Sequence, residues 1–242
     1  MDSRPKIGLN MGRCAAEEGV ALERYQISAD YVQAVAEAGG MPILVPPLNC
    51  IELLRSQCQR LDGMVLIGGA DYPPDLYGAE PHPETRTVCT ERARADMALA
   101  RHLFSESRIP VLGICLGHQL IQLAHGGALI QHLPKAERHK KVRTGLDREH
   151  RVHVRPGTRL HSIFGTDSLL VNSAHHQGID ADTIPQELEI AARDEDGMVE
   201  AVQGRDPARF VLGVQWHPER IRDEPHRRRL FSAFVDECRS QH

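Results

Sequence analysis

The feature that most constrains the fold is an alternation of short apolar segments with longer amphipathic segments in the first half of the chain. The apolar segments have the length and composition of strands, and they lie at residues 6–10, 41–47, 62–69 and 109–115. Apolar positions spaced as on one face of a helix predict helices from about Gln26 to Gly39-Gly40, over 50–61 and over 90–107. This alternation is typical of an α/β fold, in which helices cover both faces of a parallel sheet.

Beyond about residue 125 the alternation weakens, and strand-like segments dominate. They lie at residues 151–156, 169–177, 188–204 and 209–219, and residues 194–197 have the composition of a hairpin turn. A last helix is expected over 225–239. The chain has no internal repeat, low-complexity tract or linker-like segment, so residues 1–242 are predicted to form a single domain.

Composition and charge exclude several classes of protein. The 242 residues are 41% hydrophobic, which is enough to bury a full core. A formal net charge of -4, from 29 basic and 33 acidic residues, provides no basic field for nucleic acid. Six cysteines without a CxxC pair fit a reducing cytosol, and no apolar run approaches the ~20 residues needed to cross a bilayer. We therefore expect a soluble, cytoplasmic protein with no nucleic-acid or membrane partner.

The segment GICLGHQ places Cys115 between Gly113 and Gly117, at the junction of a predicted strand and a predicted helix. Glycines two residues before and after a nucleophile are typical of a strand-to-helix elbow, because its sharp turn leaves no room for bulky flanking side chains. The N-terminus of the following helix favours a thiolate over a thiol. The alternative is a structural cysteine, since free cysteine is among the most buried residue types. The pattern alone leaves both interpretations open.

A cysteine nucleophile requires a base, and the segment GVQWHPE supplies a candidate in His217. His217 and Glu219 follow an apolar strand, so they are expected at the carboxyl edge of the sheet, where ligands bind in open α/β folds. Cys115 is expected at the same edge, and Glu219 has the chemistry needed to orient the imidazole. Taken alone, His-Pro-Glu is better explained as a surface turn, but together with the elbow it favours a catalytic site.

Two consecutive glycines, Gly68 and Gly69, follow the third predicted strand in the segment LIGGADYPPDLYG. Such a pair lets backbone amides approach a ligand closely, so Gly68 is a candidate substrate contact. The N–H groups of Gly69 and Leu116 are candidates for an oxyanion hole. Phosphate binding is the rival interpretation, but the chain has neither of the glycine-rich signatures of nucleotide-binding loops.

The 14 histidines raise the question of a metal site, above all His175 and His176 in the segment HHQ, together with His139, His150 and His153. Adjacent histidines on a strand point to opposite faces, and the chain has no HExxH motif or ordered Cys/His set. The spacing therefore predicts no metal and no cofactor. A position of His175 or His176 along the substrate pocket is preferred.

The basic segment KAERHKKVR, residues 135–143, is expected to be a solvated surface loop, and a cover over the site or a partner contact is the weaker alternative. The five other cysteines have no such partners in sequence and are expected to be inert. They are Cys14, Cys50, Cys58, Cys89 and Cys238.

Together, GICLGHQ, GVQWHPE and the IGGAD loop resemble the Cys-His-Glu machinery of class I glutamine amidotransferase domains, over nearly the whole chain. Within that superfamily, GGADYPPDLYG, VNSAHHQGID and DEDGMVEAVQG are most similar to the gamma-glutamyl-gamma-aminobutyrate hydrolase branch, which is grouped with the C26 peptidases. The resemblance implies a flavodoxin-like α/β fold with a mostly parallel sheet and a small antiparallel extension.

The same resemblance implies roles for individual residues. Cys115 would be the nucleophile, His217 the general base and acid, and Glu219 the group that orients His217. Gln119 and the SAHHQ segment, with His175, His176 and Gln177, would help to hold the gamma-glutamyl group. The sequence departs from this branch at Leu116 and His118, because the branch often has arginine directly after the cysteine and a less polar residue two positions further on. The departure concerns the exact substrate and not the chemistry.

The preferred function is a cysteine hydrolase that releases glutamate from gamma-glutamyl-aminobutyrate or a gamma-glutamyl polyamine, as in polyamine (putrescine) breakdown, through a glutamyl thioester. The alternative is a glutaminase subunit that supplies ammonia to a separate synthetase. A binding protein with a dead site is disfavoured because Cys115, His217 and Glu219 are all present. The expected partner is a small-molecule gamma-glutamyl amine, and the sequence leaves a homodimer open.

Overall fold

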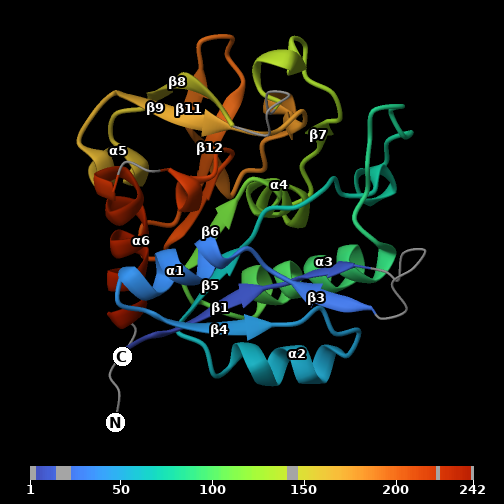
Figure 1. Cartoon of the computed structure of the whole chain (residues 1–242), viewed down its shortest axis with the longest axis vertical. Coiled ribbons are helices and arrows are strands. Elements are labelled where there is room, and N and C mark those ends of the chain that lie inside the picture. Colours follow the sequence, from blue (N-terminus) through green and yellow to red (C-terminus); the bar gives the residue numbers. More distant parts are fainter. Residues whose placement is uncertain (1–3, 15–22, 141–146, 222–223, 241–242) are drawn as a thin grey trace.

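The computed structural model describes residues 4–14, 23–140, 147–221 and 224–240, and it contains one large mixed sheet (Figure 1). Five strands at the core of this sheet run parallel to their neighbours. In order across the sheet they are β4 (Met41–Val45), β1 (Lys6–Asn10), β5 (Gly63–Leu66), β6 (Val111–Ile114) and β13 (Val211–Val214). The parallel strands predicted from the apolar segments are confirmed.

An antiparallel extension continues the sheet beyond β13, as expected. Its strands, in order, are β12 (Val199–Gly204), β11 (Leu188–Asp194), β8 (Arg148–Val154) and β9 (Ser168–Ser173). The short strands β10 (Gly178–Ile179) and β7 (Leu129–Ile130) attach at β12. In Figure 1 the extension occupies the upper half of the molecule, above the parallel strands.

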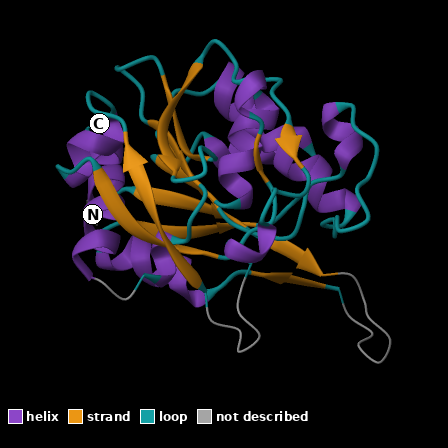
Figure 2. Cartoon of the chain, turned by 90° about the horizontal axis from the view of Figure 1, so that it is seen from above, coloured by secondary structure: helices purple, strands orange, loops and turns teal. Residues whose placement is uncertain are grey.

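Helices cover both faces of the sheet, which gives the flavodoxin-like arrangement that was predicted (Figure 2). One face carries α1 (Ala29–Glu37), α5 (Arg159–Phe164) and α6 (Glu224–Arg239), and the other carries α2 (Ile51–Cys58), α3 (Thr90–Ser105) and α4 (Leu116–Ala124). Alternate residues of each strand point to opposite faces. Val65 and Leu112 accordingly pack into the core under α1 and α6, whereas Met64 and Val111 pack into the core under α2, α3 and α4.

The sequence-based start of the first helix is wrong. Residues Arg24–Gln26 form strand β3, which pairs with β2 (Gly12–Cys14) in a separate two-stranded sheet. Helix α1 begins only at Ala29, because the Ser28 side chain accepts a hydrogen bond from the Asp30 N–H at 3.3 Å and caps the helix. A residue with this capping ability marks the start of the helix better than the apolar pattern alone.

Four short 3-10 helices complete the described elements. They are η1 (Pro74–Tyr77), η2 (Ala136–Arg138), η3 (Ala181–Thr183) and η4 (Pro218–Arg220). Among the residues that the structure describes, none of the helices combines the length and the apolar character needed to span a bilayer.

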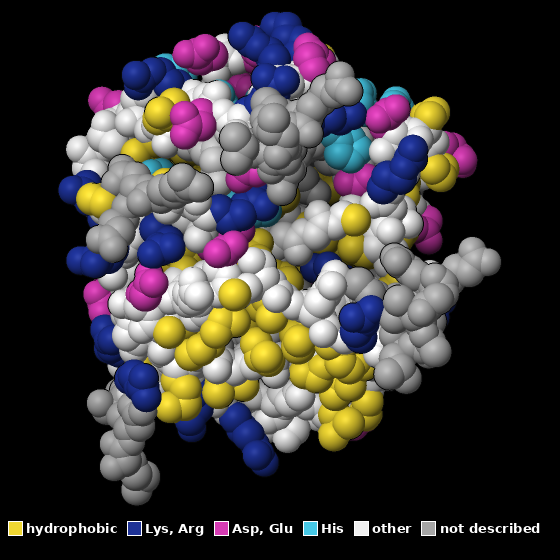
Figure 3. Space-filling view, viewed as in Figure 1, with side chains coloured by type: hydrophobic (Ala, Val, Ile, Leu, Met, Phe, Trp, Pro, Cys, Tyr) yellow, Lys and Arg dark blue, Asp and Glu magenta, His cyan; other side chains and the backbone are white. Residues whose placement is uncertain are grey.

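Apolar side chains gather on the lower half of the face in Figure 3, where Figure 1 places β4 and α2. Leu44 on the edge strand β4 is 47% exposed, and Leu53 on α2 is 54% exposed. The homodimer that the sequence leaves open stays a prediction.

The carboxyl ends of β5, β6 and β13 lie side by side because these three parallel strands are neighbours in the sheet in the order β5, β6, β13. Each is followed by a segment singled out in the sequence: the glycine pair after β5, Cys115 after β6 and His217 after β13. The topology therefore brings three segments that are far apart in the chain to one edge.

Candidate active site

Cys115 lies on a sharp turn between β6 and α4 with φ 54° and ψ −104°, a backbone conformation that residues other than glycine rarely adopt. Its N–H donates to Val214 O at 2.8 Å, which fixes the turn against β13. A Cβ on Gly113 would lie 2.6 Å from Gly117 O, and one on Gly117 would lie 2.0 Å from Leu66 O. The flanking glycines are therefore required by the close backbone packing that the elbow pattern predicts.

Burial alone does not separate a nucleophile from a structural cysteine at this position, since Cys115 is only 6% exposed. Two other features of Cys115 favour a nucleophile over a structural cysteine. The residue lines an open cleft and keeps a strained backbone, whereas a packing cysteine needs neither. Cys58 and Cys238 are the contrasting case, because burial in the core raises the pKa of both thiols.

His217 and Glu219 form a buried pair at the end of β13. His217 Nδ1 lies 2.7 Å from Glu219 Oε1, and the two residues are 7% and 2% exposed. The backbone of His217 is held on both sides by Asn172 of β9, which accepts from His217 N–H at 2.9 Å and donates to His217 O at 3.0 Å. The imidazole is thereby fixed in the cleft that Cys115 also lines.

The electrostatics of this site favour a charged imidazole. Burial disfavours the imidazolium, but the Glu219 carboxylate and the neighbouring Cys115 sulfur outweigh burial and raise the pKa of His217 to about 10. His217 is therefore positively charged at neutral pH. A cation beside the sulfur stabilises a thiolate, which is the nucleophilic form of cysteine.

Gln215 is a neighbour of the sulfur that the sequence did not single out. Its Nε2 lies 3.6 Å from Cys115 Sγ, and its Oε1 accepts from Gln119 Nε2 at 3.2 Å. Gln119, predicted to hold substrate, is 3% exposed and takes part in this chain of contacts to the sulfur. Gln215 directly follows β13 and lies two residues before His217, and this spacing is the sequence signal that could have identified it.

The glycine pair lies directly beside Cys115 and His217. The Gly68 N–H donates to the Tyr31 hydroxyl at 3.0 Å, and Gly68 O accepts from Arg92 Nη2 at 3.2 Å. A Cβ on Gly68 would lie 2.9 Å from His217 Cε1. Glycine is required here because the loop approaches the imidazole so closely. In this structure the Gly68 amide is engaged by Tyr31.

The loop that carries these glycines is anchored by a buried polar network. Asn10 Oδ1 accepts from the Ile67 N–H at 2.8 Å, and Asn10 Nδ2 donates to Asp96 Oδ1 at 2.9 Å. The second Asp96 oxygen accepts from Tyr72 OH at 2.8 Å and from Arg92 Nε at 3.1 Å. A fully bonded network of this kind fixes the loop geometry.

Gly69 and Leu116, the predicted oxyanion donors, lie next to each other: a Cβ on Gly69 would be 3.0 Å from Leu116 Cδ2. Leu116 is the first residue of α4, so its N–H is one of the helix N-terminal amides without an intrahelical partner. Both residues line a small chamber of about 160 Å³ that also borders Cys115. Their oxyanion role stays a prediction.

The SAHHQ segment, residues 173–177, forms another wall of this chamber. His176 Nε2 lies 3.1 Å from both carboxylate oxygens of Asp71. His175 is 6% exposed with Nδ1 3.0 Å from Gln177 O, and Gln177 donates to Gln131 O at 3.1 Å. All three residues thus lie near Cys115, but the side chain of Gln177 is engaged with the backbone of a neighbouring loop.

A larger cleft of about 860 Å³ also borders Cys115. Tyr31, Gly68, Arg92, His217 and Arg220 are among its lining residues. Cys115 therefore borders both the small chamber and the larger cleft. This arrangement suits a substrate with a short arm on one side of the reacting bond and a larger group on the other.

The fold has a counterpart among solved structures. A putative GMP synthase subunit from Thermoplasma acidophilum matches with a TM-score of 0.67, and the match covers 98% of this chain and 96% of that chain at 21% identity. The two proteins therefore share the same α/β fold.

The family follows from the sequence comparisons, because the model of the peptidase C26 family matches residues 5–219. The chain is 38% identical over 238 residues to the putative glutamine amidotransferase Rv2859c of Mycobacterium tuberculosis, covering 97% of this chain and 75% of that protein. It is 34% identical over 251 residues to the gamma-glutamyl-gamma-aminobutyrate hydrolase PuuD of Escherichia coli (strain K12), covering 98% and 94%. The chain belongs to the peptidase C26 family, which confirms the resemblance noted in the sequence.

Proposed function

We propose that the protein is a cysteine hydrolase that cleaves the gamma-glutamyl amide bond of a gamma-glutamylated amine, releasing glutamate and the free amine. The family and the hydrolase relative support a hydrolase that acts on amide bonds. The observation that carries the proposal is the strained backbone of Cys115 beside a charged His217 that is bonded to Glu219. A core cysteine would require neither feature.

In the first half of the reaction, the Cys115 thiolate attacks the side-chain amide carbon of the substrate. The Gly69 and Leu116 N–H groups receive the developing oxyanion, and each such donor typically lowers the barrier by ~3 kcal/mol. The imidazolium of His217 gives its proton to the nitrogen of the leaving amine as the carbon–nitrogen bond breaks. The products of this half are the free amine and a glutamyl thioester on Cys115.

In the second half, His217 is neutral and accepts a proton from water, which attacks the thioester carbonyl. Collapse of the tetrahedral intermediate releases glutamate and restores the thiolate and the imidazolium. Glu219 keeps Nδ1 of His217 bonded throughout, so that Nε2 faces the sulfur and the substrate. Asn172 fixes the backbone of the same residue.

The two cavities support a leaving amine larger than ammonia. The chamber of about 160 Å³ beside Gln119, His175 and His176 suits the glutamate part of the substrate. The cleft of about 860 Å³ leaves room for an aminobutyrate or polyamine group. We place the reaction in the breakdown of gamma-glutamylated polyamine intermediates in the cytoplasm.

A glutaminase subunit that supplies ammonia to a separate synthetase is the second candidate. The observation in its favour is the Mycobacterium tuberculosis relative at 38% identity, which is named a putative glutamine amidotransferase. The two functions use the same Cys115 chemistry and differ in the size of the leaving group.

A substrate panel separates the two functions. The purified chain alone is assayed for glutamate release from glutamine, gamma-glutamyl-aminobutyrate, gamma-glutamylputrescine and the matching alpha-glutamyl compounds. The hydrolase proposal predicts a higher kcat/KM for at least one gamma-glutamyl amine than for glutamine, and no cleavage of alpha-glutamyl controls. Activity confined to glutamine, appearing only when a cell extract supplies a partner, would overturn it in favour of the glutaminase.

A further inference from the structure

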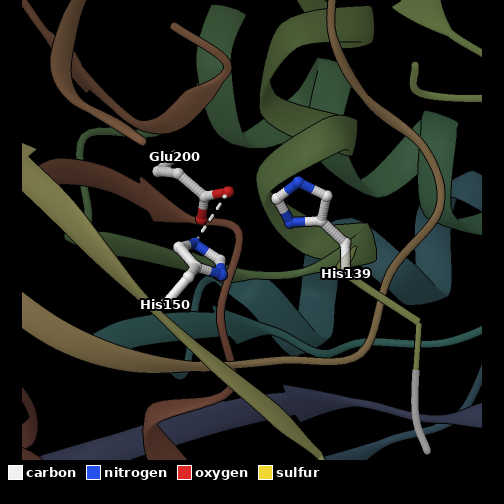
Figure 4. A group of neighbouring side chains, drawn as sticks. All are labelled: His139, His150 and Glu200. Carbon is white, nitrogen blue, oxygen red and sulfur yellow. Dashed lines mark ion pairs between the residues drawn. The ribbon is translucent and has the colours of Figure 1, made fainter. Parts of the chain in front are cut away.

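Behind the SAHHQ segment, the structure brings together three potential metal ligands from distant parts of the chain: His139, His150 and Glu200 (Figure 4). His139 follows η2, His150 lies on β8 and Glu200 lies on β12. One ligand atom of each residue lies within 4.8 Å of the others. In Figure 4 the imidazole of His139 faces the paired side chains of His150 and Glu200 across a common space.

The polar groups of this cluster are buried without adequate partners. Glu200 is 0% exposed, and neither of its carboxylate oxygens accepts a hydrogen bond with good geometry. Both ring nitrogens of His150 are buried and equally lack a hydrogen bond. Burying a carboxylate without hydrogen bonds is costly, and such groups are normally paired or bound to a cation.

His150 and Glu200 form an ion pair, and the distances within the cluster also suit ligands of one metal ion. Glu200 Oε1 lies 3.3 Å from His150 Nε2 and 3.6 Å from His175 Nε2. Two ligands that bind one zinc ion tetrahedrally at about 2.0–2.1 Å lie roughly 3.3 Å apart. A single ion beside Glu200 Oε1 would therefore reach both histidine nitrogens with little movement.

The tautomer of His175 points to the same conclusion. Its Nδ1 lies 3.0 Å from Gln177 O, and a carbonyl oxygen can only accept, so this nitrogen carries the hydrogen. The other ring nitrogen, Nε2, is buried without a hydrogen-bond partner and lies 3.6 Å from Glu200 Oε1. Metal-binding histidines commonly donate their second nitrogen to a backbone carbonyl in this way.

We propose that His139, His150 and Glu200, with His175 as the fourth ligand, form a binding site for Zn²⁺. Imidazole and carboxylate ligands in a buried, four-coordinate arrangement suit this ion. Asp194 contributes a second negative charge, because its Oδ2 lies 3.5 Å from His139 Nε2 and it is 6% exposed. The ion would clip the SAHHQ segment and the segment around His139 to the antiparallel strands, which is a structural role.

A cavity of about 560 Å³ gives the ion a route to the site. The residues that line it include His139, His150, Glu149 and Asp194.

The prediction of a solvated surface loop over residues 135–143 is wrong at His139, which is only 3% exposed. Lys135 and Arg138 of that segment agree with the expectation, because both are exposed and pair with Asp196. Residues 141–143 lie outside the described part of the chain.

The test is Zn²⁺ binding by metal-free protein, measured by isothermal titration calorimetry and by metal analysis after gel filtration. The parent chain should bind about one equivalent of Zn²⁺ and should gain thermal stability on binding. His150→Ala and Glu200→Gln should each weaken binding by at least about 100-fold, beyond the 10- to 100-fold typical of residues that only support a ligand.

Two control variants separate this site from others. His153→Ala removes an exposed histidine from the same strand, and Cys115→Ala removes the catalytic thiol as a competing zinc ligand. Both should bind Zn²⁺ as the parent does. The proposal would be overturned if the parent protein retained less than one equivalent of Zn²⁺. It would also be overturned if His150→Ala bound Zn²⁺ with the same affinity as the parent.

A spectroscopic readout covers the case in which the buried variants do not fold. Co²⁺ in a four-coordinate site has intense visible absorption bands, whereas six-coordinate Co²⁺ absorbs weakly. The parent and Cys115→Ala should give the four-coordinate spectrum, and His139→Gln, at the wall of the cavity, should lose it. Absence of the four-coordinate Co²⁺ spectrum from the parent protein would contradict the proposed site, whatever the stability of the variants.

Discussion

The backbone conformation of Cys115 lowers the stability of the fold, but it also displays the sulfur at the site. Its φ of 54° with ψ of −104° is close to the mirror image of an extended conformation, which glycine adopts freely and other residues do not. Strain of this kind costs about 1–3 kcal/mol. The chain retains it because the turn places Cys115 at the border of both the chamber and the cleft.

Replacement of Cys115 should therefore remove activity without unfolding the protein. We expect Cys115→Ala to be soluble and folded, with glutamate release lost and substrate affinity largely kept. Cys115→Gly should be equally inactive and at least as stable as Cys115→Ala, because relief of strain offsets the ~0.5–1 kcal/mol entropic cost of glycine. Circular dichroism melts and the substrate panel measure both quantities. A Cys115→Gly protein clearly less stable than Cys115→Ala would show that the turn is not strained.

The pair formed by His217 and Glu219 predicts a graded loss of rate. Glu219→Gln keeps a hydrogen-bonding oxygen near Nδ1 but removes the charge that stabilises the imidazolium, so kcat should fall. His217→Ala removes the proton donor and acceptor, and kcat should fall further, beyond the 10²–10⁴-fold typical of general acid–base catalysis. Stopped assays of glutamate release compare the two variants. Wild-type rates in both would exclude the pair from the chemistry.

The charge on His217 can be observed directly. Because its pKa is raised to about 10 from a usual value of 6.5, the imidazole should keep its proton at neutral pH and lose it near pH 10. Its contribution to stability is fully present below about pH 6.5 and is lost as the pH rises through 10, with a slope of up to ~1.4 kcal/mol per pH unit. An NMR titration of His217 measures the midpoint, and Glu219→Gln should lower it. A midpoint below neutral pH in the parent protein would contradict the ion pair.

At the scale of elements, the site depends on a contact between the antiparallel extension and the parallel core. Asn172 on β9 reaches the backbone of His217 at the end of β13 with two hydrogen bonds. The two strands are not neighbours in the sheet, since β12, β11 and β8 lie between them. The extension is therefore part of the proposed catalytic arrangement and not only an appendage of the core.

Asn172→Ala tests this dependence. Loss of both bonds leaves buried backbone groups unpaired at a cost of about 1–3 kcal/mol each, so the imidazole should lose its fixed position. We expect kcat to fall with KM little changed, since the residue acts through His217. Ser168→Ala on the same strand is the matched control and should leave kcat unchanged. Equal kcat values for Asn172→Ala and the parent would contradict the positioning role.

The sequence predicts elements best where local signals agree. The parallel strands β1, β5, β6 and β13 are recognisable because they are largely buried and have continuous apolar sequences. The hairpin turn at 194–197 joins β11 to β12 as expected. The sequence does not reveal strand β3, because a short, exposed strand has no apolar pattern. The start of α1 was therefore predicted too early. Pairing partners such as β8 with β11 depend on long-range packing and cannot be read from local periodicity.

At the scale of the whole molecule, the sequence locates the proposed reacting groups but not the groups that hold them. Cys115, His217 and Glu219 carry recognisable spacing, and parallel strand order brings them together. Tyr31 and Arg92 reach the glycine loop from helices that lie far away in the sequence. The cluster of His139, His150 and Glu200 has no regular spacing either, because its members meet only when the extension folds.

The central claim is that Cys115 forms a glutamyl thioester with a gamma-glutamyl amine, and rapid-quench mass spectrometry tests it most directly. The parent protein is mixed with excess gamma-glutamyl-aminobutyrate, quenched in acid during the first turnover and digested. We predict that the mass of one glutamyl group appears on the peptide that contains Cys115 and is absent from the Cys115→Ala protein. A glutamyl adduct on another residue, or glutamate release by Cys115→Ala at the parent rate, would contradict the account.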